Sequence, residues 1–363
     1  MASWSNLDKL KLHYEFVYSI HINRTHNDKV DYNIKGNKNK LLTALSNLLL
    51  YSGRMNYNSE KKILKIIKEI NPTIVYLDSS YLGRLSKLIK KHSPSIKIIS
   101  FFHNIELDFE INRLKSGQIY FLPSFLSAIY NEKLAVKYSD AIIALHESDS
   151  QRCFEIYGRS ADYLLPISLS ESIGVKNTPT TSYSKREKPV IGFIGTAFYA
   201  NIEAVKYIVN NIANEIHDAD FIIVGRGFEN YKNKFERDNV KVIGSIDSIP
   251  DFYKSVDFIL SPVFTGAGMK VKIAEALAYN KLIIASSFSL IGYEKIVDNK
   301  AVISCVNKND FIKNIKLTLS KIKESGESDF NSRIKFEKFY SGELLAYNLK
   351  IFIDGLLDKN YDK

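Results

Sequence analysis

Short apolar runs rich in β-branched residues alternate with segments of helical periodicity along most of the chain. Runs of this kind, bounded by Gly, Pro or polar residues, are typical of buried strands in parallel sheets. In the first half they are YEFVYSIHI (14–22), TIVYL (73–77), KIISFF (97–102), DAIIAL (140–145) and DYLLP (162–166). In the second half they are VIGFIG (190–195), DFIIVG (220–225), VKVIG (240–244), DFILSP (257–262), LIIAS (282–286) and AVISC (301–305). The alternation predicts βαβ units and an α/β fold.

The strand-helix alternation is interrupted once, by the polar segment SESIGVKNTPTTSYSKREKP at 170–189. Its Ser, Thr and Pro content is typical of a linker. We therefore expect two doubly wound, Rossmann-like domains, over residues 1–169 and 190–345, with 170–189 between them. Residues 346–363 are expected to form a C-terminal helix, and one option is that it crosses back to the first domain.

Composition narrows the class of protein. A chain of 363 residues with 45% hydrophobic content is long enough for two cores. Cys153 and Cys305 lie far apart and have no His or Cys neighbours at metal-ligand spacing, which favours neither a disulfide framework nor a zinc site. No apolar run approaches the roughly 18 residues of a membrane span. We expect a cytoplasmic protein, soluble or peripheral on the inner face of the membrane.

The net charge of +10 is concentrated in the first half of the chain, where residues 1–170 hold 23 Lys and Arg against 16 Asp and Glu. The helical segments KKILKIIK (61–68) and GRLSKLIKKHSPSIK (83–97) contribute most clearly. One interpretation is the solvated face of ordinary amphipathic helices. The other is a surface for anionic lipid or a phosphorylated acceptor, through Lys87, Lys90 and Lys91 beside Leu85, Leu88 and Ile89. No recognition motif for nucleic acid accompanies the charge.

The segment GAGMKVKIAEALAYN (266–280) carries the strongest chemical signal. The chain turns through Gly266, Ala267 and Gly268 after a strand and then enters a helix, whose free N–H groups favour a phosphate. Lys270 would add a positive charge, and Glu275 could accept hydrogen bonds from ribose hydroxyls. The alternative is that the glycines only permit a turn and that Lys272 and Glu275 form a surface pair at i,i+3 spacing.

Two further strand exits of the second half, GFIGTAFYANIEAV (192–205) and VGRGFEN (224–230), also carry glycines. Neither has the Gly-x-Gly-x-x-Gly spacing, which disfavours a nicotinamide dinucleotide site. An ordinary β-α turn explains either one equally well. The motif DAD (218–220) imitates a metal-binding Asp-x-Asp, but it directly precedes a predicted strand and is expected to begin it.

Taken together, LSPVFTGAGMKVKIAEALAYNKLIIAS, GFIGTAFYANIEAVKYI and FIIVGRG resemble the group 1 (family 4) retaining glycosyltransferases of the GT-B fold, in particular those of bacterial capsule and O-antigen clusters. The resemblance covers about residues 97 to 350. It implies two Rossmann-like domains facing across a cleft, the second binding a nucleotide sugar. It also implies a reaction that requires no metal and no cofactor besides this donor.

The same resemblance implies roles for individual residues. Glu275 would hold the ribose, and the diphosphate and sugar would contact Gly266, Ala267, Gly268, Met269 and Lys270. Thr196 and Arg226 would lie on the other side of the donor, with Ser245 against the base. Many family members carry a glutamate where Thr265 stands. Members normally begin with a short strand and a glycine-rich loop, and the opening MASWSNLDKLKLHYEF shows neither.

In the first half, SFFHNIELDFE (100–110) follows a strand directly. A lone histidine there is more often structural, but capsule-type members of the family show a similar His-Asn-x-Glu. The resemblance implies acceptor-side or sugar-contacting roles for His103, Asn104 and Glu106, with His103 and Glu106 among the catalytic candidates beside Lys270. Glu147, in LHESDS (145–150), is a further acceptor-side candidate or only a helix cap. YFLPSFLSAIYNEKLAVKY (120–138) is interpreted as core, the alternative being a groove for a lipid acceptor.

Three functions remain open on the sequence. The first is a retaining glycosyltransferase acting by a front-face route on a glycan or polyprenyl-linked acceptor in surface polysaccharide synthesis. The second is a nucleotide-sugar epimerase, which should carry more acid and base groups. The third is a truncated, non-catalytic module that binds a nucleotide sugar.

Overall fold

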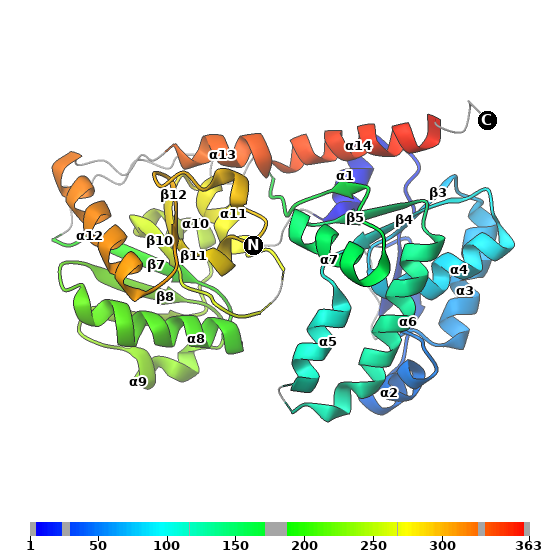
Figure 1. The fold of residues 1–363 in the computed structure, drawn as a ribbon, viewed down its shortest axis with the longest axis horizontal. Helices are drawn as coiled ribbons and strands as arrows, with labels where there is room; N and C mark the ends of the chain where they lie inside the picture. Colours follow the sequence, from blue (N-terminus) through cyan, green and yellow to red (C-terminus); the bar gives the residue numbers. More distant parts are fainter. Residues whose placement is uncertain are drawn as a thin grey trace. The chain divides into compact units, whose positions relative to one another are not determined.

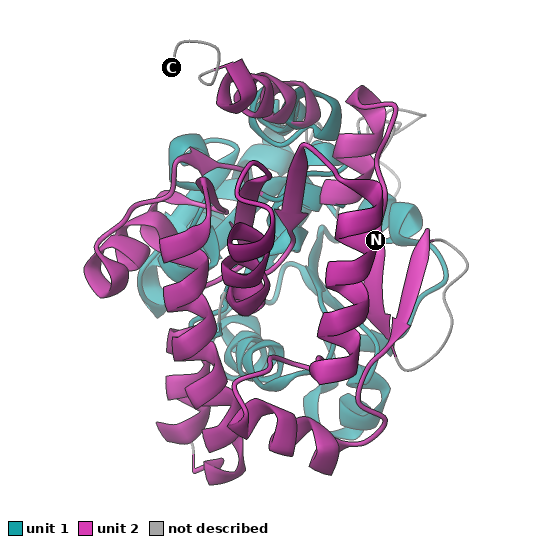
Figure 2. Ribbon diagram, turned by 90° about the vertical axis from the view of Figure 1, so that its right-hand side faces the viewer, with its two compact units in different colours: residues 1–5, 167–345 teal, residues 6–166, 346–363 magenta. Residues whose placement is uncertain are grey.

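The computed structural model describes residues 5–23, 30–115, 117–170, 187–266, 268–325 and 331–358. The chain divides into two compact units (Figure 2). Unit 1 comprises residues 1–5 and 167–345, and unit 2 comprises residues 6–166 and 346–363. Most of the predicted linker, 171–186, and Ala267 of the glycine loop lie outside the described residues.

Unit 1 is built on a six-stranded parallel sheet (Figure 1). Its strands are β7 (Val190–Ile194), β8 (Asp220–Val224), β9 (Val240–Gly244), β10 (Phe258–Ser261), β11 (Leu282–Ser286) and β12 (Val302–Cys305). The spatial order is β12-β11-β10-β7-β8-β9. Chain order therefore reverses between β7 and β10, and in open parallel sheets ligands bind outside the carboxyl ends of the strands at such a switch point.

Helices cover both faces of the unit 1 sheet (Figure 1). They are α8 (Tyr199–Tyr207), α9 (Lys232–Phe235), α10 (Ile249–Ser255), α11 (Val271–Ala278), α12 (Lys308–Ser325) and α13 (Ser332–Phe339), with short turns η4 (Ile208–Ile212), η5 (Ala213–Glu215), η6 (Phe228–Tyr231), η7 (Ser287–Leu290) and η8 (Glu294–Ile296). One face packs side chains of α8 and α12 on Phe193, Phe221 and Phe258. On the other face α10 approaches Gly192, where an added Cβ would lie 2.8 Å from Phe252. Both faces are buried, which explains the continuous apolar runs.

Unit 2 contains two separate parallel sheets. One pairs β1 (Ile20–Asn23) with β2 (Tyr32–Lys35), and the other has the order β3 (Ile74–Leu77), β4 (Lys97–Phe102), β5 (Ala141–Ala144), β6 (Tyr163–Leu164). Side chains of both sheets share a core with α3 and α4, including Ile34, Ile63, Leu77, Leu85 and Ile89. Among the described residues no strand pairs β1 with β3. The strand predicted at 14–22 is shorter than expected, since β1 covers only Ile20–Asn23. The sequence pattern did not predict β2, whose residues YNIK alternate between apolar and polar.

The helices of unit 2 are α1 (Asn6–His13), α2 (Lys40–Leu48), α3 (Tyr57–Ile70), α4 (Gly83–His92), α5 (Glu106–Lys115), α6 (Leu122–Tyr138) and α7 (Glu147–Tyr157), with η1 (Ser80–Leu82) and η2 (Ile119–Phe121). The last helix, α14 (Gly342–Asp358), is grouped with unit 2 from Ala346 onwards. There Phe352 stacks on Tyr163 of β6 at 4.7 Å, and Tyr14 donates a hydrogen bond of 2.8 Å to Asp354.

The basic helix α4 buries its apolar side and uses one of its three lysines inside unit 2, while Lys87 and Lys91 are exposed. Leu85 and Ile89 are buried in the core, and Lys90 forms an ion pair of 2.7 Å with Asp140. Lys90 also donates to the carbonyl of Ile96 at 2.8 Å, so its charge is used inside unit 2. In the part of the chain that the structure describes, no helix is long and apolar enough to cross a membrane. Cys153 and Cys305 are both buried free thiols.

Candidate active site

The glycine loop and the loop after β7 lie at the switch point of the unit 1 sheet. β10 ends at Ser261, and the chain reaches α11 through Gly266 and Gly268, whose φ angles are +108° and +66°. Such angles strongly favour glycine, so the two glycines permit this turn. β7 ends at Ile194, next to β10 in the sheet, and is followed by Gly195 and Thr196. The structure thus brings together two of the loops that the sequence singled out.

Lys270 and Met269 connect the loop to the body of unit 1 in different ways. Lys270 is the residue before α11, and its Nζ donates a hydrogen bond of 2.6 Å to the carbonyl of Gly268 and lies 4.8 Å from the centre of the Phe288 ring. The Met269 side chain is buried against Gly292. The Met269 side chain is therefore used in packing, whereas the Lys270 ammonium is bonded to the glycine loop.

Glu275 lies in α11 and is almost completely buried. Tyr253, which is itself fully buried, donates a hydrogen bond of 3.1 Å to Glu275 Oε2. Burial raises the pKa of Glu275, against the opposing effects of the Tyr253 hydroxyl and the Lys272 charge. A hydrogen-bonded carboxyl group enclosed in this way is held in one orientation, as recognition of a ribose diol requires.

The position of Lys272 contradicts the surface pair that the sequence left open as an alternative. The i,i+3 spacing suggested a surface pair with Glu275, but Lys272 is buried. Its Nζ donates a hydrogen bond of 3.0 Å to Asn201 Oδ1 and lies 4.0 Å from the centre of the Phe193 ring. Burial lowers the pKa of Lys272 to about 7, helped by the charge of Lys270 and opposed by that of Glu275. A nearby anion would restore the positive charge.

Lys272 also connects the two loops of the switch point. Asn201, its partner, donates a hydrogen bond of 2.8 Å to the carbonyl of Thr196. A Cβ added at Gly195 would lie only 2.6 Å from Asn201 Nδ2 and 3.1 Å from Lys272 Nζ. The ammonium group therefore lies directly behind the turn that follows β7, where it can stabilise negative charge bound at that turn.

A carboxylate from another element stands beside Thr265. The Thr265 hydroxyl donates a hydrogen bond of 2.8 Å to Glu203 Oε2, and Glu203 belongs to α8. The sequence pattern drew attention to the missing glutamate at 265, but it could not indicate that α8 supplies one from 62 residues away. Glu203 is a second acidic side chain close to the glycine loop.

The residues that follow β7 and β8 and the end of β9 contact one another through backbone atoms. Gly225 donates a hydrogen bond of 2.7 Å to the carbonyl of Gly244, and an added Cβ at Gly225 would lie 1.8 Å from the carbonyl oxygen of Gly195. The three remaining donor-side candidates follow these glycines and are exposed: Thr196, Arg226 and Ser245. Among the described residues the side chains of these three do not contact one another, so their roles stay predictions.

The DAD motif behaves as expected for the start of a strand. Asp220 is the first residue of β8, and Asp218 forms an ion pair of 3.0 Å with Lys323 of α12. No group of three or more His, Cys, Asp or Glu residues with metal-binding geometry occurs among the described residues.

In unit 2, His103 follows β4 and contacts Asp78, which follows β3. His103 Nε2 donates a hydrogen bond of 3.0 Å to the Asp78 carbonyl and lies 3.4 Å from Asp78 Oδ1. Burial favours the neutral ring, but the hydrogen bond and charge of Asp78 outweigh it and raise the pKa of His103. Asp78 directly follows a strand, as His103 does, so the same criterion would have predicted Asp78 as a candidate.

Glu106 lies at the start of α5 among other acidic groups. Burial and the charges of Glu132 and Glu110 raise the pKa of Glu106 to about 7. Glu132, which is fully buried in α6, accepts hydrogen bonds from the N–H groups of Glu106 and Leu107, at 2.8 and 3.2 Å. Glu106 can therefore change its protonation state near neutral pH, as a general acid or base requires.

Asn104 and Glu147 differ in their surroundings. The Oδ1 atom of Asn104 is buried and has no hydrogen-bond partner. Glu147 is exposed in the first turn of α7, and His146, not Glu147 or Asp149, is the N-cap of that helix, accepting a bond of 3.2 Å from the Asp149 N–H. Asn104 lies on the same loop as His103 and Glu106, whereas Glu147 follows a different strand.

We expect Glu106 to make the stability of unit 2 depend on pH. Its folded pKa, about 7, lies above the ordinary value of 4.5, so the folded state binds the proton more tightly. The resulting stabilisation is fully present below about pH 4.5 and is lost as the pH rises through about 7. Relative to Glu106→Gln, the parent should lose on the order of 1 kcal/mol over this window, since partial exposure reduces the effect. Thermal midpoints of both proteins across pH 4.5–8 measure this, and parallel curves would contradict it.

Comparison with known proteins gives a family match for part of the chain and structural matches for most of its length. Residues 188–321 match the glycosyl transferases group 1 family. This region contains the switch point, the glycine loop and Glu275. Comparison with curated proteins gives no match.

Solved GT-B structures resemble the chain over most of its length. A glycosyltransferase from Rickettsia africae shares 18% identity with a TM-score of 0.67, covering 94% of this chain and 90% of its own. HepE from Anabaena, crystallised with UDP, shares 13% identity with a TM-score of 0.65, covering 82% of each chain. The lipopolysaccharide outer core galactosyltransferase WaaB shares 17% identity with a TM-score of 0.62, covering 90% of this chain and 85% of its own. The chain has the GT-B fold.

Proposed function

We propose that this protein is a retaining glycosyltransferase of family 4. It would transfer a sugar from a nucleoside-diphosphate sugar to a glycan or polyprenyl-linked acceptor in bacterial surface polysaccharide synthesis. The observation that carries the proposal is the position of the glycine loop, Lys270 and Glu275 at the switch point of the unit 1 sheet. The group 1 match over 188–321 supports it. So do the solved relatives, since HepE was crystallised with UDP and with UDP-glucose, and WaaB is a lipopolysaccharide galactosyltransferase.

The residues of unit 1 divide the recognition of the donor between them. Glu275 accepts hydrogen bonds from the ribose hydroxyls, while the loop from Gly266 to Lys270 and the N-terminus of α11 bind the diphosphate. Lys272, buried behind Gly195, becomes fully charged when the diphosphate arrives. Glu203 and Thr265 face the hydroxyls of the sugar.

Negative charge develops on the nucleoside diphosphate as it leaves, next to the N-terminus of α11. In this proposal the N–H groups of the loop, Lys270 and Lys272 stabilise that charge, so no metal is required. A front-face route retains the anomeric configuration and needs no enzyme nucleophile. His103 and Glu106 belong to unit 2 and are assigned to the acceptor side, with Asn104 on the same loop.

The test is hydrolysis of nucleotide sugars in the absence of an acceptor. UDP- and GDP-sugars are first ranked by thermal shift, and release of the nucleoside diphosphate is then followed for those that bind. Slow hydrolysis supports a transferase. Binding without release would favour a non-catalytic module, and interconversion of the sugar without release would favour an epimerase.

The Lys270 ammonium should contribute more to the binding of a nucleoside diphosphate than to the binding of the bare nucleoside. Lys270→Ala is expected to weaken binding of the nucleoside diphosphate by about tenfold and to leave the bare nucleoside nearly unchanged, because only the former carries the partner charge. Titration calorimetry of parent and variant with both ligands measures the difference. Lys254→Ala, at an exposed site in α10, is the control. An equal loss for both ligands would assign Lys270 a structural role.

A further inference from the structure

Helix α2 has its apolar side turned away from the protein. Its leucines and the capping Leu49 are between 45% and 70% exposed: Leu41, Leu42, Leu45, Leu48 and Leu49. Thr43, Ala44, Ser46 and Asn47 are the residues of α2 that are less exposed, and Asn47 is buried. A helix on the surface of a soluble protein normally turns its leucines toward the core. The reversed orientation leaves apolar surface in contact with water.

Neighbouring elements extend this apolar surface. Helix α2 packs against α6, and η2 leads directly into α6 (Figure 1). Four large side chains of η2 and α6 are exposed as well: Ile119, Tyr120, Leu122 and Leu126. We call these residues and the leucines of α2 the leucine surface. Large exposed apolar side chains gathered on neighbouring elements indicate an interaction site, whereas isolated exposed leucines need no explanation.

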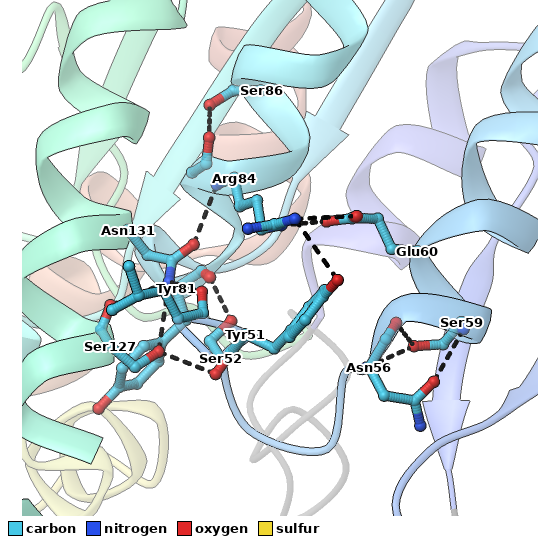
Figure 3. A network of polar contacts seen from close by, with 12 residues as sticks. Tyr51, Ser52, Asn56, Ser59, Glu60, Tyr81, Arg84, Ser86, Ser127 and Asn131 are labelled. Atoms are coloured by element: carbon cyan, nitrogen blue, oxygen red, sulfur yellow. Dashed lines mark hydrogen bonds and ion pairs between the residues drawn. The ribbon is translucent and has the colours of Figure 1, made fainter. Parts of the chain in front are cut away.

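A buried polar network holds the leucine surface in this orientation (Figure 3). Ser127 of α6 donates a hydrogen bond of 3.0 Å to the carbonyl of Tyr51, and Asn131 of α6 donates one of 3.1 Å to the carbonyl of Leu50. Both α6 side chains are fully or nearly fully buried. The chain directly after α2 is therefore tied to the core.

The residues that precede α2 also form hydrogen bonds with it. Asn39 caps the helix by accepting a hydrogen bond of 2.8 Å from the N–H of Leu42, and Asn37 donates one of 2.9 Å to Ser46. The outward leucines are thus a fixed part of the folded unit, because the polar side of α2 is the side that is bonded to the protein.

The only charged side chains in the segments that carry the leucine surface are positive. Neither 32–59 nor 111–131 contains an Asp or a Glu. Five exposed cations lie in these segments: Lys35, Lys38, Lys40, Arg54 and Lys115. None of the five forms an ion pair with another described residue, in contrast to Lys90 of α4. An apolar face bordered by uncompensated cations matches the interface of a bilayer that contains anionic lipid.

We propose that the leucine surface inserts into the interface of an anionic lipid bilayer and anchors unit 2 there. The leucines enter the boundary between headgroups and acyl chains, while the lysines contact the headgroup phosphates. Tyr120 suits this depth, since aromatic residues with a polar group are enriched at membrane interfaces. The inference stands on the geometry of unit 2 and does not depend on the proposed transfer reaction, although a lipid-linked acceptor would be reached from such a position.

The test is flotation of the full chain with vesicles of neutral phosphatidylcholine and with vesicles that also contain phosphatidylglycerol. The parent should float with the anionic vesicles and do so less as salt rises, because the attraction of the cations is screened over roughly 8 Å at physiological ionic strength. Leu45→Ser/Leu48→Ser should lower the partition coefficient about tenfold, since two apolar side chains no longer enter the bilayer. Lys38→Gln/Lys40→Gln should also lower it and weaken its dependence on salt.

Matched control variants distinguish binding through the leucine surface from nonspecific binding through any exposed leucine or lysine. Leu317→Ser removes an equally exposed leucine from α12, and Lys87→Gln/Lys91→Gln removes two exposed lysines from α4, so both should float like the parent. Circular dichroism confirms that each variant is folded. If the parent ignores anionic vesicles at low salt, the proposal is wrong. A parent that instead forms oligomers, dissociated by Leu45→Ser/Leu48→Ser, would make the surface an interface between copies and would equally overturn it.

Discussion

Replacing Glu275 with alanine is expected to weaken binding of the nucleotide by ten- to a hundredfold, or about 1.5–3 kcal/mol, the range for a hydrogen bond to a charged group. The carboxylate would accept bonds from two vicinal ribose hydroxyls, and alanine offers no side-chain acceptor in its place. Titration calorimetry with UDP and GDP measures the loss. Unchanged affinity for whichever nucleotide binds the parent would remove Glu275 from the donor site.

Two further variants separate ribose contact from damage to the fold. Tyr253→Phe removes only the hydroxyl that bonds to Glu275, so it should reduce affinity less than Glu275→Ala. Glu275→Gln keeps the size of the side chain and one acceptor, and we expect an intermediate loss. If Tyr253→Phe weakens binding as strongly as Glu275→Ala, the effect comes from the packing of α11 and not from the ribose.

The largest effect on stability is expected for Glu132→Ala, which should destabilise unit 2 by about 3–5 kcal/mol. Its buried carboxylate accepts hydrogen bonds from Tyr157 at 2.7 Å, from Ser80 at 3.1 Å and from the N–H groups at the start of α5. Burial raises the pKa of Glu132, although these bonds oppose the effect. Each buried donor left without a partner costs about 1–3 kcal/mol, and rotation of the two hydroxyls recovers part of that.

Hydrogen exchange followed by mass spectrometry is the suitable measurement, because it reports each unit separately. Glu132→Ala should increase exchange in α5 and α6 and leave the helices of unit 1 unchanged. Tyr157→Phe removes one of the donors and is expected to cost about 1 kcal/mol, which makes it the matched control. Equal exchange in the two variants would mean that the carboxylate does not stabilise the start of α5.

The candidate site could be predicted from the sequence where its residues follow a strand directly. The glycine loop, Thr196, Arg226, Ser245 and His103 all satisfy this rule, because the carboxyl ends of parallel strands lie along one edge of a sheet. Asp78 directly follows β3 and satisfies the same criterion, although it was not among the predicted residues. The roles of these residues in binding and catalysis remain predictions.

Other members of the site could not be predicted, because helices bring them from a distance in the sequence. Glu203 reaches Thr265 from α8, and Glu132 reaches the start of α5 from α6. Neither has a spacing that indicates its partner. Lys272 shows the limit most clearly, since its i,i+3 spacing from Glu275 places both side chains on one side of a helix but does not indicate whether that side is exposed or buried.

Hydrophobic periodicity by itself determined the strands of the unit 1 sheet and of the four-stranded sheet in unit 2, since strands buried on both faces must be apolar at nearly every position. It also determined the order of strand and helix from which the α/β class follows. Only the tertiary structure decided which side of a helix meets the core. In α11 the polar Lys272 and Glu275 point inward, and in α2 the leucines point outward. Periodicity fixes how side chains on one helix lie relative to each other, whereas their burial depends on what the neighbouring elements offer: Asn201 and Tyr253 for the first helix, Ser127 and Asn131 beside the second.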